Sequence, residues 1–229
     1  MPKVVTSRTA VLNADPVMGR IVKAAGRFAL KPRMERPAFE SLARSIAHQQ
    51  LSGIVAAKIM ERFCALYAPA EFPSPLQLLA TTPVALRATG FSFAKIRALH
   101  DLAEKATAGV VPANSHLATL DNETIIERLT TVRGIGRWTV EMMLMFQLGR
   151  PDILPVTDFG VQNGFRLAYG LRALPTPTAL AKFGERWAPH RTAAAWYLWR
   201  AVDLEREGRL AKAPKPAPRV KQQKRRAHR

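Results

Sequence analysis

The stretch LTTVRGIGRWTVEMMLMFQLGRPDILPVTDFGVQ, residues 129–162, decides the fold of this chain. Near its start, Val132-Arg133-Gly134-Ile135-Gly136 sets two glycines one residue apart between two segments of helical pattern, which predicts helix, tight hairpin, helix. Glycine adopts positive φ and lets backbone approach a ligand without an intervening Cβ. Free amides at a helix start bind phosphate oxygens. The hairpin is therefore a candidate phosphate site, and a tight packing turn is the alternative.

The segment after the hairpin predicts a buried helix and then a second helix that begins at an acid. Residues 138–148 are apolar nearly all round, with Glu141 as their one charge, which predicts a buried helix. Residues 153–156 are expected to be extended, and Asp158 opens another helical pattern. Asp is a favoured N-cap, and a helix N-terminus favours the charged form of a carboxylate. Asp158 is therefore either a structural cap or a fixed anion that faces the hairpin across a cleft.

The composition is that of a globular protein without membrane spans. The 229 residues suffice for one or two domains with a sizeable core. Apolar residues make up 48%, but no apolar run approaches the length of about eighteen residues that would span a membrane. The first residues lack the apolar block of a signal peptide. A lone cysteine, Cys64, excludes a disulfide framework and a Cys-based metal or iron-sulfur site. We expect a cytoplasmic protein.

The chain is strongly basic, with a net charge of +18 and a pI near 11.1. This charge indicates a polyanionic partner, and nucleic acid is favoured over an anionic membrane because no basic amphipathic helix is evident. Residues 211–229 carry eight Lys or Arg and no Asp or Glu, and their composition predicts a disordered arm. The body remains basic without this arm, which either adds phosphate attraction or only aids solubility.

The remaining pattern predicts helices throughout. One is expected from Asp15-Pro16, two flank the polar turn His48-Gln49-Gln50, and one begins near Ser92, where Lys95 is a phosphate contact or part of a solvated face. Residues 109–116 are expected to be a loop, and Asp121 to open the helix before the hairpin. A helix over residues 178–187 and another from about Pro189 to Glu207 complete the chain.

Four segments of the chain resemble one family. GIGRWTVEMMLMFQLGRPDILPVTDFGV resembles the helix-hairpin-helix, Gly/Pro-rich loop and Asp signature of the DNA glycosylase superfamily. It is most similar to the 3-methyladenine DNA glycosylase II branch, also called alkylbase DNA glycosylases. FESLARSIAHQQLSG, GFSFAKIRALHDLA and ERWAPHRTAAAWYLWRA resemble the same branch, so the likeness runs from about Arg36 to Ala201.

The resemblance implies an all-α, two-lobed helix-hairpin-helix glycosylase fold with a cleft between the lobes. Residues 36–152 would form one lobe, with the wedge turn and the hairpin. Residues 153–210 would form the other, joined by the basic segment 1–35 and followed by the tail 211–229. A monomer is expected.

The resemblance also implies the activity, which is release of 3-methyladenine and 7-methylguanine from double-stranded DNA by base flipping. Cutting the N-glycosidic bond gives the sugar oxocarbenium character, so a fixed carboxylate near the anomeric carbon would stabilise it and orient water. Asp158 is the candidate for this role, and His190 is the alternative general base. A mismatch glycosylase and a catalytically silent DNA-binding protein are the alternative functions.

Residues that match the branch fill the other roles. Trp138 and Trp199 would face the extruded base, and Met142 stands where a relative has a tyrosine. Trp138 also occupies the position of the lysine that attacks the sugar in strand-cleaving relatives, so no lyase activity is expected. No cofactor and no iron-sulfur cluster are required, although a monovalent cation could bind the hairpin backbone. The phosphate-binding residues of the hairpin would be Arg133, Gly134, Ile135, Gly136, Arg137 and Thr139.

Leu51 is an apolar residue in a polar turn. It is either a hydrophobic staple before the Ser52 cap or, as the resemblance implies, a wedge that fills the gap left by the extruded nucleotide. In the second case Gln50 and Ser52 would touch the minor groove beside it.

Overall fold

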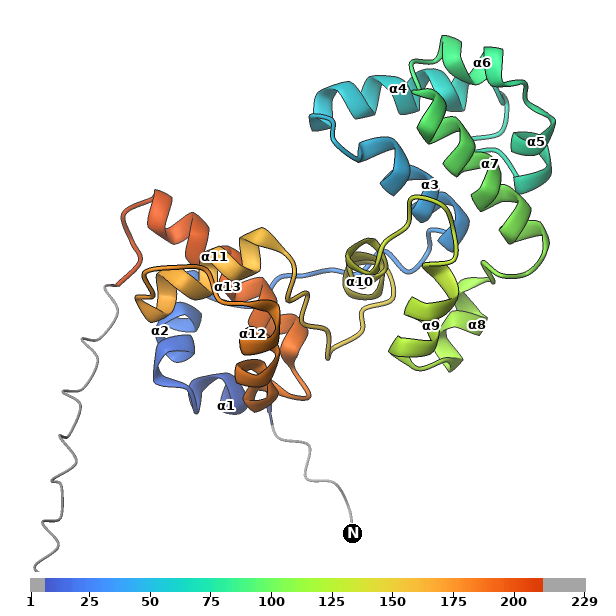
Figure 1. Ribbon diagram of the computed structural model, residues 1–229. Helices are drawn as coiled ribbons and strands as arrows, with labels where there is room; N and C mark the ends of the chain where they lie inside the picture. Colours follow the sequence, from blue (N-terminus) through green and yellow to red (C-terminus); the bar gives the residue numbers. More distant parts are fainter. Residues whose placement is uncertain (1–6, 212–229) are drawn as a thin grey trace, which may run out of the picture.

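The computed structural model describes residues 7–211, and the regular elements in this part of the chain are helices (Figure 1). The all-α prediction is confirmed. Apart from Ala211, the predicted tail lies outside the described residues. In chain order the elements are α1 (Arg8–Asn13), α2 (Pro16–Ala25), α3 (Ala38–His48), α4 (Gly53–Ala65), α5 (Pro75–Ala80), α6 (Pro83–Ala88), α7 (Phe93–Thr107), α8 (Asn114–Thr119), α9 (Asn122–Leu129), α10 (Arg137–Phe146), α11 (Phe159–Tyr169), α12 (Pro177–Gly184), the 3-10 helix η1 (Glu185–Trp187) and α13 (Arg191–Arg206).

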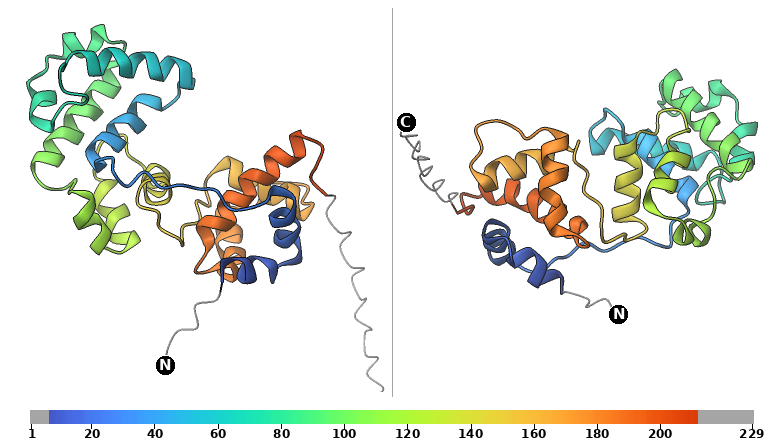
Figure 2. Two further views of the ribbon diagram at one scale, coloured as in Figure 1. Left: turned by 180° about the vertical axis from the view of Figure 1, so that it is seen from behind. Right: turned by 60° about the horizontal axis from the view of Figure 1, so that its bottom comes forward.

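The helices gather into two lobes, as predicted. One lobe holds α3 to α9, the other holds α1, α2 and α11 to α13, and α10 lies between them (Figure 1). Figure 2 shows the same arrangement from behind and with the lower side turned forward. In the second lobe, α11 and α2 both pack on α13, so the N-terminal helices join elements from the far end of the chain. In the first lobe, α7 packs against α3 and α5.

Short polar side chains begin many of these helices. The Asp15 carboxylate accepts hydrogen bonds from the backbone N–H groups of Val17 and Met18 at the start of α2. Ser52 caps α4 and Asp121 caps α9 in the same way. Such a side chain satisfies an amide that has no partner within its own helix. The predicted starts of α2, α4 and α9 are confirmed because each carries this local signal.

Two predictions about the helices are wrong. The loop expected over residues 109–116 contains the start of α8, whose N-cap position is Ala113 and has no side-chain cap to announce the helix. The helix expected to be buried all round is only half covered: Val140 and Leu144 are buried, but Trp138 is 46% exposed and Phe146 is 42% exposed. The reason is the place of α10 between the lobes, because helices of the first lobe cover only one of its faces.

Candidate active site

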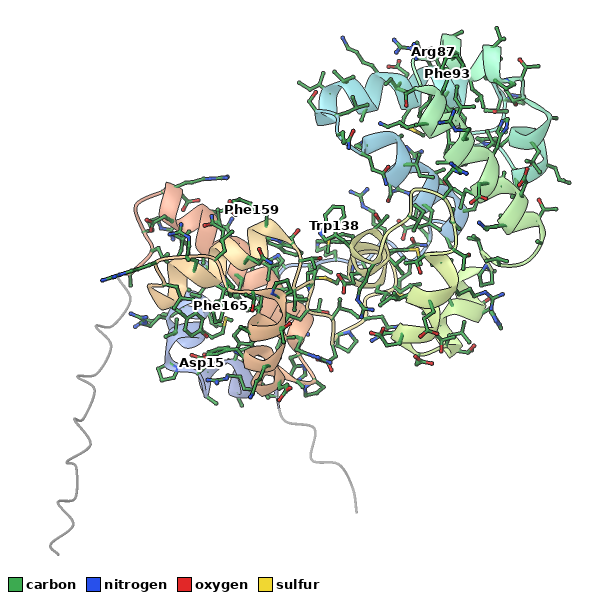
Figure 3. All side chains as sticks on the ribbon, viewed as in Figure 1. Asp15, Arg87, Phe93, Trp138, Phe159 and Phe165 are labelled. Atoms are coloured by element: carbon green, nitrogen blue, oxygen red, sulfur yellow. The ribbon has the colours of Figure 1, made fainter. Side chains whose placement is uncertain are left out.

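Asp158 is the N-cap of α11, and both of its carboxylate oxygens accept hydrogen bonds. Oδ1 accepts from the backbone N–H of Val161 at 2.8 Å and from the indole N–H of Trp199, on α13, at 2.8 Å. Oδ2 accepts from the indole N–H of Trp138, on α10, at 2.9 Å. Figure 3 shows Trp138 on the side of α10 that faces the lobe of Phe159. The structure thus brings together three of the predicted site residues.

Asp158 is half-buried, and its capping bond to Val161 leaves its other oxygen to the Trp138 indole. A helix N-terminus stabilises a carboxylate through its dipole and its unpaired amides. The two indoles add neutral donors and fix the orientation of the carboxylate plane. The result is a negative charge whose position is set by three elements, α10, α11 and α13, rather than by one flexible side chain.

A second carboxyl lies in the same region, on the buried side of α10. Glu141 is 5% exposed, and its Oε2 atom is buried without a hydrogen-bond partner. Burial raises the pKa of Glu141, the Arg137 guanidinium opposes this shift, and the negative charges of Glu123 and Asp158 add to it. Oε1 of Glu141 accepts from Nε of Arg137 at 3.1 Å.

The three predicted base-pocket residues do not line the same hollow. Trp138 and Met142 line a hollow of about 500 Å³ at the N-terminal half of α10. Trp199 does not line it; its ring stacks on Phe146 with centroids 5.8 Å apart and planes at 25°. Asp158 connects the two tryptophans because it accepts from both indoles. The lining of the hollow is Ser45, His48, Gln49, Gln50, Gly134, Trp138, Thr139 and Met142.

The turn that carries Leu51 is held from inside the lobe. Nζ of Lys95 donates to the backbone carbonyls of Ala47 and Gln49, at 2.7 and 2.8 Å. Gln50 has a φ of 57°, in the left-handed region, and the Leu51 side chain is 39% exposed. Burial lowers the pKa of Lys95. Lys95, expected from the sequence on a phosphate-binding or solvated face, is therefore a brace for this turn.

The same turn is tied to the hairpin. Nε2 of Gln49 donates to the Gly134 carbonyl at 2.8 Å. Sequence reasoning missed the observed roles of both Gln49 and Lys95, because each donates to backbone carbonyls and such partners leave no residue pattern. Ser52 has the local role expected of it, since its hydroxyl accepts from the N–H of Val55.

The hairpin itself joins α9 to α10. Gly134 has a φ of 76°, which explains the first glycine, whereas Gly136 is the extended N-cap of α10. No side chain caps α10, so the amides of its first turn are not engaged by a capping residue. The N–H of Arg133 donates to Asp101 at 2.6 Å, and Lys105 pairs with the same carboxylate at 2.8 Å.

The other residues expected on the hairpin have different surroundings. Ile135 and Thr139 are buried, at 4% and 6% exposure. The guanidinium of Arg137 is engaged by carboxylates, in a two-pronged pair with Glu123 and a second contact with Glu141. His190 is the N-cap of α13 and lines a separate hollow with Arg150 and Thr192.

Comparison with known proteins identifies the family of this chain. The model of the HhH-GPD superfamily base excision DNA repair proteins matches residues 43–190, a span that includes the turn of Leu51, the hairpin and Asp158. The chain belongs to the HhH-GPD superfamily. It is 41% identical over 186 residues to DNA-3-methyladenine glycosylase 1 of Schizosaccharomyces pombe, covering 81% of this chain and 82% of that one.

Solved structures of HhH-GPD proteins have the same fold. That of the Schizosaccharomyces pombe 3-methyladenine DNA glycosylase in complex with abasic DNA aligns with a TM-score of 0.75 at 39% identity, over 85% of this chain and 96% of that one. That of a DNA-3-methyladenine glycosidase from Bacillus halodurans aligns with a TM-score of 0.80 at 33% identity, over 89% and 92%.

Two further findings concern residues 7–211 of this HhH-GPD protein. Within this range no group of three or more His, Cys, Asp or Glu side chains is placed to hold a metal ion. Among the helices of the same range, none combines the length and the apolar character needed to cross a membrane.

Proposed function

We propose that this HhH-GPD protein is a monofunctional DNA glycosylase that releases alkylated purines, 3-methyladenine and 7-methylguanine, from double-stranded DNA and so begins base excision repair. The observation that carries the proposal is the Asp158 carboxylate, held between the indole N–H groups of Trp138 and Trp199. The relatives named as DNA-3-methyladenine glycosylases support the same activity.

Asp158 would act on the sugar rather than on the base. The transition state for N-glycosidic cleavage places positive charge on the anomeric carbon, and a fixed negative charge beside the sugar lowers its energy more than that of the ground state, in which the sugar carries no such charge. Since both oxygens of Asp158 already accept hydrogen bonds, the carboxylate needs little reorganisation to meet this charge. Its second contribution is to orient the water that attacks the sugar.

The base would be recognised through the aromatic faces and the apolar side chain of Met142. An indole face attracts a cation by roughly 0.5 to 2 kcal/mol. Purines methylated at N3 or N7 are cationic and have a labile glycosidic bond, so this attraction and Asp158 suffice. The side chains of Trp138, Met142 and Trp199 themselves offer no polar group to read exocyclic substituents of neutral bases, apart from the indole N–H groups that Asp158 occupies. Trp138 and Met142 would contact the base in the hollow that they share, and Trp199 would contact it from outside that hollow.

The hairpin would bind the phosphate backbone of DNA, and the Leu51 side chain would enter the base stack. The uncapped first turn of α10 presents backbone amides to a phosphate, and the exposed Leu51 side chain is placed on a braced turn. The Gln49 bond to the Gly134 carbonyl couples the two, so phosphate binding fixes the place where the wedge enters the base stack. Gln50 and Ser52 would flank the wedge in the minor groove.

The reaction would stop at the abasic site. Trp138 stands where a Schiff-base lysine would have to be, and the sequence has no lysine between Lys105 and Lys182. The Lys95 ammonium is occupied by two carbonyls. We infer hydrolysis with an intact strand and no requirement for a cofactor, with a monovalent cation at the hairpin backbone as an optional aid to phosphate binding.

The test is incubation with duplexes that each carry one damaged base, with base release as the readout. The proposal requires release of 3-methyladenine and 7-methylguanine to exceed that of uracil or 8-oxoguanine, and Trp199→Leu to reduce this preference. Best activity on a thymine or adenine mismatch would replace the proposal with a mismatch glycosylase. DNA binding without release of any base would indicate a silent DNA-binding protein.

A further inference from the structure

Gly160, the second residue of α11, has no backbone reason to be a glycine. Its φ is not among the positive values of this chain, which belong to other residues. It lies in a regular helix, where glycine is among the least favourable residues because it loses the most backbone freedom.

The space beside Gly160 supplies a reason. A Cβ at this position would lie 2.7 Å from Cδ1 and 2.9 Å from Nε1 of Trp199, and 3.1 Å from Oδ1 of Asp158. The first two separations are shorter than real Cβ contacts allow. The missing side chain therefore leaves room at the point where the Trp199 indole N–H meets the Asp158 carboxylate.

Neither the helices nor the ring can easily move to admit that Cβ. One turn further along α11, a Cβ on Gly164 would lie 2.6 Å from the Leu198 carbonyl carbon, so the backbones of α11 and α13 are already in close contact there. One face of the indole is covered by Phe146, which stacks on it. A methyl group at position 160 would displace the indole edge that donates to Asp158.

We propose that Gly160 is a positioning residue for the reaction: it leaves the space in which the Trp199 N–H reaches Oδ1 of Asp158 and fixes the carboxylate. The proposal rests on the proposed function for its kinetic consequence. Its structural consequence, the indole to carboxylate hydrogen bond, can be measured without any activity.

The experiment compares Gly160→Ala with Gly19→Ala, in which alanine enters α2 and its nearest neighbour is the exposed Asn13, at 3.3 Å from the side-chain oxygen. Under single-turnover conditions Gly160→Ala should lower the rate of base release by about 10- to 100-fold, the range expected when a hydrogen bond to a charged group is lost. Its DNA affinity should stay close to that of the wild type, its melting temperature should fall no further than that of Trp199→Leu, which lacks the same hydrogen bond, and Gly19→Ala should keep the full rate.

A double-mutant cycle identifies the cause. If Gly160 acts through the indole, adding Gly160→Ala to Trp199→Leu should change the rate no further, because the displaced ring is gone. The same loss in both backgrounds, or a wild-type rate in Gly160→Ala, would overturn the proposal.

A readout on the free protein separates this proposal from the proposed function. The indole N–H resonance of Trp199, assigned by its absence in Trp199→Leu, should exchange with solvent faster in Gly160→Ala than in the wild type. Unchanged exchange would refute the positioning role. Wild-type protein that releases no base, but whose Trp199 N–H loses protection in Gly160→Ala, would refute the proposed function and leave the positioning role standing.

Discussion

Replacing Asp158 with asparagine removes the charge and keeps the shape. The amide oxygen of Asn can still accept from Val161 and Trp199, and Asn caps a helix about as well as Asp. Its NH₂ group would face the Trp138 indole N–H, donor against donor, so one hydrogen bond is lost. Because Trp138 is 46% exposed and water replaces part of the lost bond, the cost in stability should be about 0.5 to 1.5 kcal/mol, which urea unfolding measures.

The catalytic cost of the same change should be larger and separable. Removing a positioned electrostatic group raises the barrier by roughly 3 to 4 kcal/mol, or about 10²- to 10³-fold in rate. DNA affinity should change little, because the proposed phosphate contacts lie on the hairpin. The assay is single-turnover release of 3-methyladenine from a defined duplex at saturating enzyme.

Asp121→Asn is the matched control, since Asp121 also caps a helix but is bonded only within the first turn of α9. It should leave the rate unchanged. A rate for Asp158→Asn within a few fold of the wild type, in protein shown to be folded, would refute the role of Asp158.

Three further changes test the wedge, the hairpin and the buried acid. Leu51→Ala should slow base release from a fully paired duplex more than from a mispaired site, because unstacking costs a few kcal/mol; equal losses on both substrates would favour a staple. Gly134→Val should weaken binding to undamaged DNA in a filter or anisotropy assay, since valine disfavours the φ of 76° and blocks the approach of phosphate; unaltered affinity would remove the hairpin from the interface. Burial raises the pKa of Glu141, so its folded form keeps a proton above the ordinary value of 4.5, and the stability it contributes is lost as pH rises through the raised pKa. The free energy of unfolding of Glu141→Gln, relative to wild type, should therefore increase as the pH rises above 4.5; a pH-independent difference would contradict this.

Local signals account for what the sequence could predict. A few adjacent residues determine each of these features: the Asp158 cap, the positive φ of Gly134, and the starts of α2 and α4. The family resemblance supplied the two-lobed arrangement, which helical periodicity alone does not contain.

Features that depend on residues distant in the sequence could not be predicted. Lys95 braces the Leu51 turn through two carbonyls, a role that its charge and position on α7 do not signal. The half-exposed state of Trp138 depends on which lobe covers α10, and the hydropathy of the sequence carries no information about that arrangement. Gly160 looks like any helical glycine until the Trp199 ring is placed beside it.

The most direct test of the account is one reaction: wild-type protein with a duplex containing a single 3-methyladenine, run in the presence and absence of borohydride. The account predicts free 3-methyladenine equal in amount to the abasic sites formed, an uncut strand, and no covalent complex with borohydride. If the protein bound the DNA but left the base attached, the proposed glycosylase activity would be contradicted. A borohydride-trapped complex would contradict hydrolysis by water at a site organised around Asp158.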